Sequence, residues 1–341
     1  MPHPVVAILG ATGAVGNEFL RVLEQRHFPM SELRLLASPR SAGKQVLFRG
    51  KMHTVQAVTR EAFAGVDIGL FSAGGSVSVQ WAPIAAEQGA LVIDNTSAFR
   101  MEADVPLVVP EVNGHLLDTR PARGIFANPN CGTIPLVHAL SPLHEQWGLQ
   151  RLVVSTYQSV SGKGAAAMDE LEAQSLAHLT GDGAVDPEQF PHPIAFNLLP
   201  HIDSFTENGY TKEEMKVVHE SRKIMGLPEL HASATCVRVP VFRAHSLSVN
   251  ATFATEVDAG RAREMLAESR GIVVIDDPSK NEYPMPRYAD GLDETFVGRI
   301  RKDISNPFGT GLDMWIVSDN LRKGAALNAV QIAEEWLARK A

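Results

Sequence analysis

Cysteine is the rarest residue type with reactive chemistry in this sequence, since only Cys131 and Cys236 occur among 341 residues. Two cysteines at this separation match neither a secreted disulfide framework nor a zinc or redox motif, which predicts a reducing compartment. No HExxH-like pattern is present, so the sequence gives no support for a metal site.

The sequence also lacks an excess of positive charge and any long apolar run. The formal net charge of -8 argues against nucleic acid or an anionic membrane as a partner, and any bound phosphate must meet a local cluster of donors. The apolar run Val5–Leu9 is far too short to cross a bilayer. The first residues, Met-Pro-His-Pro, lack the basic region of a signal peptide. We therefore expect a cytoplasmic protein.

The first third of the chain alternates short apolar runs with helical segments. The expected strands are 4–9, 33–37, 66–71, 89–93 and 124–127, and the expected helices are 14–25 and 79–88. Such alternation predicts right-handed βαβ units and a parallel sheet.

Beyond Cys131 the pattern changes. We expect helices at 134–144 and 323–340, and strands at 149–159, 232–242 and 246–257. The last two strands alternate polar and apolar residues, which is typical of an antiparallel sheet with one solvated face. The stretch 181–210 is either a loop or an interface segment. Two domains are therefore expected, with a boundary near Cys131 and the last helix returning to the first domain.

A glycine-rich segment follows the first expected strand. It reads Gly10-Ala-Thr-Gly13-Ala-Val-Gly16 and opens the first expected helix. Glycines there permit a tight turn and let the backbone approach a pyrophosphate, which a helix N-terminus attracts. Because the spacing is GxxGxxG and not GxGxxG, a turn with purely structural glycines remains an alternative to a dinucleotide site.

The end of the second expected strand favours NADP over NAD. An NAD site usually presents an acid there to bind the ribose hydroxyls, but this segment carries Ser38, Arg40 and Ser41, and the nearest acid, Glu32, precedes the strand. Hydroxyls and a guanidinium suit a 2′-phosphate, since arginine forms a charge-assisted fork. An exposed loop arginine is the alternative interpretation of Arg40.

Cys131 is the predicted nucleophile. It follows Asn128-Pro-Asn130 between an expected strand and an apolar helix. The sulfur is therefore expected at a helix N-terminus, where the dipole and the amides stabilise a thiolate. Cys236 lies inside an alternating strand, which is typical of a small core residue.

The thiolate needs a base, and twelve histidines compete for this role. His245 is distinguished by the segment Arg238-Val-Pro-Val-Phe-Arg-Ala-His245, which joins two alternating strands. Arg238 and His245 lie an odd number of positions apart, so a continuous strand would place them on opposite faces unless the turn between them breaks the alternation. The residues alone therefore leave His245 as one candidate among several.

Six segments, in order, resemble the aspartate-semialdehyde dehydrogenase family. They are Gly10-Ala-Thr-Gly-Ala-Val-Gly, Ser38-Pro-Arg-Ser-Ala-Gly-Lys, Asp94-Asn-Thr-Ser-Ala-Phe-Arg, Asn128-Pro-Asn-Cys, Tyr157-Gln-Ser-Val-Ser-Gly and Arg238-Val-Pro-Val-Phe-Arg-Ala-His-Ser. One such segment is a weak signal, but six in order, within a match from residue 4 to about 335, are specific.

The resemblance implies an α/β fold with two domains and a homodimer. Residues 1–131 form a Rossmann-type parallel-sheet domain that binds NADP, and a C-terminal helix at about 319–341 packs back on it. Residues 132–318 form an α+β catalytic and dimerisation domain with a largely antiparallel sheet.

The resemblance also implies a role for each matching residue. Cys131 forms a thioacyl intermediate, Gln158 orients the substrate and the thioester, and His245 is the acid/base. Arg238 binds the substrate α-carboxylate. The other substrate positions are Arg100 (with Asn95 nearby), Asn130, Glu213 and Lys216, and the cofactor positions are Gly10, Thr12, Gly13, Ala14, Val15, Ser38, Arg40, Ser41, Ser161, Gly162 and Asn320.

These roles suit a substrate that carries an ammonium, a carboxylate and a phosphate. Glu213 binds the ammonium, while Arg100 and Lys216 belong to the phosphate site. Because Glu213 and Lys216 lie three apart on an expected helix, a solvated ion pair is the alternative interpretation. Two residues depart from the family pattern. Gly132 stands where the family usually has Ser or Thr, and Leu247 stands where it often has Glu. Gly132 keeps the backbone amide, the expected oxyanion donor.

The implied reaction is the reductive dephosphorylation of L-aspartyl-4-phosphate by NADPH to L-aspartate-4-semialdehyde, on the route to lysine (through diaminopimelate), methionine and threonine. Cys131 displaces phosphate, hydride reduces the thioester, and His245 takes the hydroxyl proton as the aldehyde leaves. One alternative is an N-acetylglutamyl-phosphate reductase, whose acylated substrate has no use for an ammonium ligand. The other is a non-catalytic homologue that acts as a binding partner, which the retained Cys131, Gln158, Arg238 and His245 disfavour.

Overall fold

The computed structural model describes residues 3–340. It divides into two compact units, one formed by residues up to Asn130 together with those from Ala325 onward, and the other by Cys131–Gly324. The first unit is thus built from two separate stretches of the chain. Residues 319–324, grouped with the last helix in the sequence analysis, fall in the second unit.

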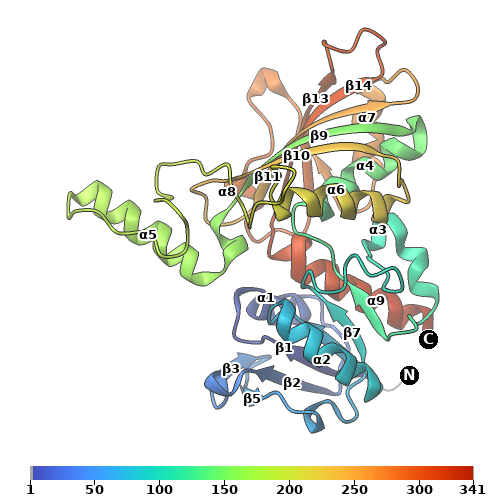
Figure 1. The fold of residues 1–341 in the computed structure, drawn as a ribbon. Helices are drawn as coiled ribbons and strands as arrows, with labels where there is room; N and C mark the ends of the chain where they lie inside the picture. Colours follow the sequence, from blue (N-terminus) through green and yellow to red (C-terminus); the bar gives the residue numbers. More distant parts are fainter. Residues whose placement is uncertain (1–2, 341) are drawn as a thin grey trace. The chain divides into compact units, whose positions relative to one another are not determined.

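The first unit contains a six-stranded sheet in the order β5-β2-β1-β6-β7-β8 (Figure 1). All neighbouring strands are parallel. The strands are β1 (Val5–Leu9), β2 (Glu32–Ala37), β5 (Gln56–Ala57), β6 (Ile68–Phe71), β7 (Leu91–Asp94) and β8 (Ile125–Ala127). The strand order reverses at β1, as in dinucleotide-binding folds, which bind their ligands beyond the carboxyl ends of the strands at that point.

Helices cover this sheet because their apolar faces need burial. Phe19 and Leu23 of α1 (Ala14–Gln25) and Val330 and Trp336 of α9 (Leu327–Lys340) join one buried cluster with the strands. The other elements of the unit are α2 (Gly75–Glu87), α3 (Pro110–Asn113) and the hairpin of β3 (Gln45–Phe48) and β4 (Lys51–Thr54). The C-terminal helix therefore belongs to the core of the first unit.

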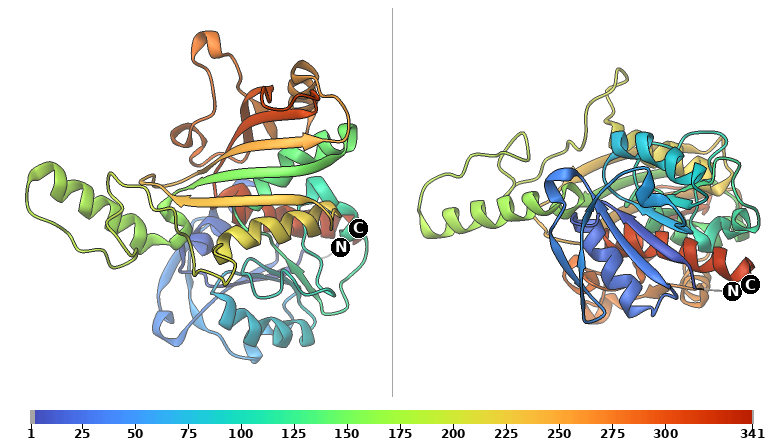
Figure 2. Two further views of the ribbon diagram at one scale, coloured as in Figure 1. Left: turned by 45° about the horizontal axis from the view of Figure 1, so that its top comes forward. Right: turned by 90° about the horizontal axis from the view of Figure 1, so that it is seen from below.

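The second unit contains a mixed six-stranded sheet in the order β10-β9-β11-β14-β13-β12, and strands of this sheet lie side by side in the left view of Figure 2. The strands are β9 (Leu149–Gln158), β10 (His231–Arg238), β11 (His245–Phe253), β12 (Ile272–Val274), β13 (Thr295–Lys302) and β14 (Gly311–Ser318). β10 is parallel to β9 and β12 to β13, while the other neighbours are antiparallel. The expected alternating strands 232–242 and 246–257 correspond to β10 and β11, which do not pair with each other because β9 lies between them.

Three helices bury their apolar faces on this mixed sheet. They are α4 (Thr133–Trp147), α6 (Lys212–Met225) and α7 (Ala259–Glu268), whose side chains share one buried cluster with the strands. α6 begins with a capping box, in which Thr211 Oγ1 accepts from the Glu214 amide and the Glu214 carboxylate accepts from the Thr211 amide. The sharp start of α6 fixes the position of Glu213. The short helix α8 (Pro286–Ala289) contacts β14.

α5 (Ala165–Thr180) projects from the sheet of its unit, as Figures 1 and 2 show. The stretch 181–210 contains no helix or strand, but α5 anchors it. Glu170 accepts hydrogen bonds from the amides of Glu188 and Gln189, and Gln174 accepts from those of Ile194 and Ala195. The stretch is therefore an ordered loop held by two buried side chains.

The expected elements exist, most of them with shifted ends. α2 begins before residue 79, β10 ends before residue 242, and a π-helical turn at Arg322–Ala326 precedes α9. α5, α7 and β12 to β14 were not expected. No helix among residues 3–340 is long and apolar enough to cross a membrane.

Candidate active site

Three neighbouring strands of the mixed sheet end or begin side by side. β9 and β10 end side by side at Gln158 and Arg238, which are register partners. β11 runs antiparallel to β9 and begins at His245. The next residue of β11, Ser246, is the register partner of Tyr157 in β9. Arg238 and His245 therefore flank the strand of Gln158. Their odd spacing is not an obstacle, because they do not lie on one continuous strand.

Cys131 lies beside His245. The Cys131 sulfur is 3.3 Å from His245 Nε2, although 114 positions separate the two residues. Cys131 immediately precedes Gly132, the N-cap residue of α4, and its side chain is partly exposed. The two residues that the family resemblance implies as nucleophile and acid/base therefore lie in contact with each other.

The opposite ring nitrogen of His245 faces Ser159. The Ser159 backbone N–H donates to Nδ1 at 3.1 Å, and Ser159 Oγ also lies 3.1 Å from Nδ1. The imidazole is fully buried. Burial, helped by the charge of Arg238, lowers the pKa of His245 to about 3, against the opposing effects of the Glu213 carboxylate and the Ala244 carbonyl. The folded protein therefore keeps this histidine neutral.

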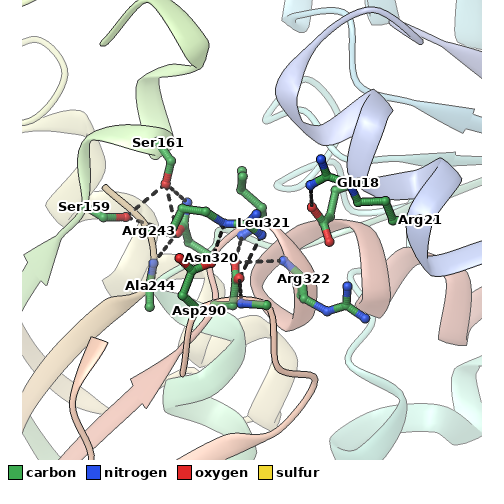
Figure 3. A network of polar contacts seen from close by, with 12 residues as sticks. Glu18, Arg21, Ser159, Ser161, Arg243, Ala244, Asp290, Asn320, Leu321 and Arg322 are labelled. Atoms are coloured by element: carbon green, nitrogen blue, oxygen red, sulfur yellow. Dashed lines mark hydrogen bonds and ion pairs between the residues drawn. The ribbon is translucent and has the colours of Figure 1, made fainter. Parts of the chain in front are cut away.

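Asn320 holds this environment together (Figure 3). Its Oδ1 accepts from the backbone N–H of Ala244 at 3.0 Å and from the hydroxyls of Ser159 and Ser161 at 3.0 and 3.1 Å. Asn320 Nδ2 donates to Ser161 Oγ at 3.0 Å. Asn320 and Ser161, expected as cofactor positions, thus lie next to His245 and orient its surroundings.

Arg238 is buried beside the same peptide. Its Nη1 donates to the Ser159 carbonyl at 2.7 Å, and its guanidinium carbon lies 6.0 Å from the centre of the Phe190 ring. Burial lowers the pKa of Arg238, and the Glu213 carboxylate opposes this effect. A Cβ added at Gly162 would lie 3.0 Å from Arg238 Nη1 and 3.5 Å from His245 Nε2, so only glycine fits there without displacing either group.

Glu213 and Lys216 are not a solvated pair. Glu213 is buried and accepts from Gln158 Nε2 at 3.3 Å and from Lys216 Nζ at 3.0 Å. Lys216 also donates to Asp203 at 2.9 Å. Burial lowers the pKa of Lys216, but the two carboxylates outweigh it and raise that pKa above its ordinary value. Asp203 comes from the stretch 181–210, so this loop contributes to the site.

The polar residues at the end of β7 form a separate network in the first unit. Arg100 Nε donates to the Asn128 carbonyl and its Nη2 to the Asn95 carbonyl, both at 2.9 Å. Asn128 Nδ2 donates to Asn95 Oδ1 at 2.6 Å. Arg100 and Asn130 are both buried. The arginine expected for phosphate is thus held by two backbone carbonyls at the loop that leads to Cys131.

The glycine-rich segment forms the expected turn between β1 and α1. Gly10 has φ +94°, and a Cβ there would lie 2.6 Å from the Ser72 carbonyl oxygen, so no other residue fits without strain. Gly13 is the N-cap residue of α1, followed by Ala14 and Val15 in the first turn, with Thr12 in the loop. The N-terminal amides of α1 are thus presented where β1 ends, which suits a dinucleotide phosphate.

Ser38 and Arg40 are exposed at the carboxyl end of β2, where a short helical turn (Pro39–Ser41) follows the strand. Glu32 lies at the opposite end of β2, opposite Val5, and is paired with Arg34 at 2.7 Å. No acid therefore stands at the strand end where an NAD site would present one.

Cys236 is a core residue of the second unit. It is fully buried within β10, and burial raises the pKa of its thiol to about 12, against the opposing influence of the nearby Thr156 side chain. The two residues that depart from the family pattern, Gly132 and Leu247, also have structural positions in the second unit. Gly132 caps α4, and Leu247 lies fully buried in the core of the second unit. Residues 3–340 contain no group of three or more His, Cys, Asp or Glu that could hold a metal ion.

Sequence reasoning missed Ser159, Asp203 and Asn128. Ser159 acts mainly through its peptide group, which no side-chain pattern reveals. Asp203 lies in a segment without periodicity, at φ +68°. Asn128 was noted only as part of a turn before the cysteine.

Two family models match the chain in agreement with this architecture. The model described as "Semialdehyde dehydrogenase, NAD binding domain" matches residues 5–120, and that described as "Semialdehyde dehydrogenase, dimerisation domain" matches residues 140–323. These define the class as a semialdehyde dehydrogenase.

The relatives narrow the class. The aspartate-semialdehyde dehydrogenase of Aquifex aeolicus is 56% identical over 330 residues, with 96% of each chain covered. The crystal structure of aspartate semialdehyde dehydrogenase II of Vibrio cholerae, complexed with ASA, has a TM-score of 0.96 at 48% identity, with 99% of each chain covered. A Candida albicans aspartate semialdehyde dehydrogenase with NADP has a TM-score of 0.77 at 27% identity, covering 99% of each chain. The chain belongs to the aspartate-semialdehyde dehydrogenase family.

Proposed function

We propose that the chain catalyses the NADPH-dependent reductive dephosphorylation of L-aspartyl-4-phosphate to L-aspartate-4-semialdehyde, in the biosynthesis of lysine, methionine and threonine. Cys131 attacks the acyl carbon and expels phosphate to form a thioester. When bound, NADPH supplies the hydride that reduces this thioester. Gln158 and His245 complete the catalytic group.

The observation that carries the proposal is the 3.3 Å contact between Cys131 and His245. It joins a thiol at the start of α4 to an imidazole, the pairing that attack on an acyl carbon and proton transfer at the same centre require. The second cysteine, Cys236, is not a suitable nucleophile because it is buried and the pKa of its thiol is raised. A single catalytic thiol is therefore proposed.

The charged groups around this pair suit an aminoacyl substrate. Glu213 offers a carboxylate to an ammonium, and Arg238 offers a guanidinium to the α-carboxylate. Arg100, Asn95, Asn130 and Lys216 are assigned to the phosphate. Glu213, next to Gln158, favours a free amino group over the acylated nitrogen of N-acetylglutamyl phosphate, because a carboxylate attracts an ammonium and has no charge to pair with in an acylated nitrogen.

NADP is the proposed cofactor. The Gly10 turn and the start of α1 fit a pyrophosphate, and Ser38, Arg40 and Ser41 fit a 2′-phosphate. Ser161, Gly162 and Asn320 are assigned to the nicotinamide side. The first unit is proposed to bind the cofactor, and the second to carry the thiol and form a homodimer in the cytoplasm.

A substrate comparison tests this proposal. Purified protein is assayed in the reverse direction with L-aspartate-4-semialdehyde, phosphate and NADP, and in parallel with N-acetylglutamate semialdehyde. Phosphate-dependent reduction of NADP with the first substrate alone is expected. Activity with the acylated substrate alone would support the reductase alternative, and a folded, NADP-binding protein without either activity would support a non-catalytic homologue.

A further inference from the structure

The turn that ends at Ala244 contains a backbone conformation that alanine rarely adopts. Ala244 has φ +68° and lies fully buried directly before His245. In this left-handed region a Cβ comes too close to the following carbonyl oxygen, so a residue other than glycine stays there only where its surroundings hold it. The contacts of this turn therefore decide the direction in which the chain enters β11.

The segment 319–324, which follows β14, binds this turn. Asp319 is fully buried, and its carboxylate accepts from Arg243 Nη2 at 2.8 Å. The next residue, Asn320, accepts from the backbone N–H of Ala244 at 3.0 Å (Figure 3). Two consecutive side chains of the segment thus bind two consecutive residues of the turn, directly before the histidine.

Asp319 is itself held in one orientation by backbone amides. Its Oδ1 accepts from the Leu321 N–H at 2.8 Å and its Oδ2 from the Gly291 N–H at 2.7 Å. Arg243 also forms an ion pair with Asp290 at 3.1 Å, but the Asp290 side chain is 48% exposed, whereas that of Asp319 is 0% exposed. Because exposed ion pairs contribute little to stability, Asp319 is the acid that determines where Arg243 lies.

The other end of the segment meets Cys131. Gly324 lies in the π-helical turn Arg322–Ala326, a local geometry that recurs at functional sites. A Cβ added at Gly324 would lie 3.1 Å from Cys131 Cβ and 3.1 Å from the Cys131 carbonyl oxygen, so a side chain there would press on the nucleophile. The Gly324 N–H donates to the Asp319 carbonyl at 3.1 Å, which ties the two ends of the segment together.

We propose that the segment 319–324 positions Cys131 and His245 relative to each other. One end of the segment fixes the turn before His245, and the other end leaves the space in which the Cys131 sulfur lies 3.3 Å from the imidazole. Asp319 and Gly324 are therefore positioning residues. The proposal rests on the proposed function for the roles of the thiol and the imidazole, and it adds the element that sets their distance.

A loosened turn is expected to affect kcat more than KM. Arg238 and Glu213, which are assigned to the substrate, lie in β10 and α6 and not in the turn. Release of Arg243 therefore moves the imidazole and leaves the groups assigned to the substrate in place. A misplacement of about 1 Å at a reacting group costs on the order of 10²-fold in rate.

The first test compares the two acids that bind Arg243. Asp319→Asn and Asp290→Asn each keep the shape of the side chain and remove its charge. In the reverse reaction, kcat of Asp319→Asn is expected to fall about 10- to 100-fold, with nearly unchanged KM values for L-aspartate-4-semialdehyde and phosphate. Asp290→Asn is expected to keep the kcat of the parent. Equal losses of kcat in the two folded variants, or a rise in KM alone, would overturn the proposal.

The second test needs no substrate. Iodoacetamide alkylates the partly exposed Cys131 in the free protein, while Cys236 is buried. Asp319→Asn is expected to slow this alkylation about tenfold near neutral pH, because the thiol loses its imidazole partner, and Asp290→Asn is expected to react like the parent. The parent rate in a folded Asp319→Asn variant would overturn the proposal even if the protein had no dehydrogenase activity. This readout therefore separates failure of the proposal from failure of the proposed reaction.

A second pair of variants keeps the test informative if Asp319→Asn does not fold. Arg243→Lys retains a cation that reaches Asp319, whereas Arg243→Gln does not. The lysine variant is expected to recover most of the kcat and of the alkylation rate that the glutamine variant loses. NADPH binding and thermal unfolding confirm that both variants are folded. Equal losses in the two would show that the ion pair does not position the histidine.

Gly324→Ala tests the other end of the segment. Alanine favours helical backbone more than glycine does, so the unfolding midpoint is not expected to fall through helix propensity, but the added methyl displaces Cys131. Both kcat and the alkylation rate are expected to fall about tenfold or more. An unchanged alkylation rate would show that Cys131 is placed without Gly324, and the two-ended arrangement would be wrong.

Discussion

Cys131 and Cys236 place the same functional group in opposite settings. Cys131 is partly exposed at the start of α4, beside an imidazole, whereas Cys236 is buried in β10 with its thiol pKa raised to about 12. Reactivity of a thiol follows its access and the fraction present as thiolate. The setting, and not the residue type, separates nucleophile from core residue.

Replacement of Cys131 by alanine is expected to abolish turnover and to leave NADPH binding and the unfolding midpoint nearly unchanged, because no other described thiol is accessible. Cys236→Ala, the matched control, should retain activity and lose about 1 kcal/mol of unfolding free energy, as for the deletion of one small buried group. Steady-state kinetics and urea unfolding of both variants test this. Similar activity losses in two folded variants would exclude a single catalytic thiol.

Arg40 sits exposed on the turn after β2, where the first unit offers no acid. Arg40→Ala is expected to weaken NADPH binding by about 1.5–3 kcal/mol, the value of hydrogen bonds to a charged group, and to leave NADH binding almost unchanged. Titration calorimetry with both cofactors measures the difference. A matched loss for NADH would mean that Arg40 supports the loop and does not recognise the 2′-phosphate.

At the level of the elements, the site depends on which strands are neighbours. The sequence identifies β9, β10 and β11 as strands from their alternation, but alternation does not say that β9 lies between the other two. The parallel pairing of β9 with β10 requires α5, the loop after it and α6 as a connection. The contact between His245 and Cys131 follows from that topology, and the family resemblance, more than the pattern, predicted it.

Local signals predicted other parts well. α1 was predicted with the bounds Ala14–Gln25 that the structure has, because its apolar face repeats with helical period and glycines precede it. β13 and β14 were not recognised, and the stretch 181–210 could not be interpreted, since long-range contacts with α5 order it. Ser159 illustrates the limit, because a peptide group carries the same donor and acceptor in every residue except proline.

α9 reaches the loop before Cys131 through one side chain. Asn328 is fully buried and donates to Asn128 Oδ1 at 2.7 Å and to the Val108 carbonyl at 3.0 Å. Asn328→Leu keeps the approximate volume but removes both donors, so it is expected to lower the unfolding free energy by about 1–3 kcal/mol for each acceptor left unsatisfied. Because Asn128 also accepts from Arg100, the KM for phosphate in the reverse reaction should rise more than kcat falls.

Gln331, one turn further along α9, is the matched control for Asn328. It donates to Glu111 Oε1 at 3.2 Å. Gln331→Leu should lower stability without changing the KM for phosphate. If the two variants change that KM equally, α9 supports the first unit in general and has no specific effect through Asn128.

For the whole molecule, the buried His245 links stability to pH. Its pKa is about 3 in the folded protein and 6.5 as the ordinary value. Between these values the unfolded chain binds a proton at His245 that the folded protein does not, so the contribution of His245 to the unfolding free energy is largest above pH 6.5 and falls as the pH falls, by up to about 1.4 kcal/mol per unit.

His245→Gln removes this contribution and leaves the other histidines in place. The variant should therefore lose less stability than the parent between about pH 6.5 and pH 4, measured by urea unfolding at several pH values. Identical slopes for the two proteins would mean that His245 titrates similarly in the folded and unfolded chains.

The division of the first unit between the two ends of the chain has a consequence for synthesis. Its sheet and α1 are made before the second unit, but α9, whose Val330 and Trp336 complete their apolar core, is made after it. Until then a strip of buried side chains remains open to water, while the second unit, being continuous, can fold as soon as it emerges. The first unit therefore completes its core only after the whole second unit has been synthesised. A ribosome-bound chain that ends near residue 324, extended by a linker long enough to clear the exit tunnel, should hold a folded second unit and an unfinished first one, a nascent state that chaperones would be expected to bind.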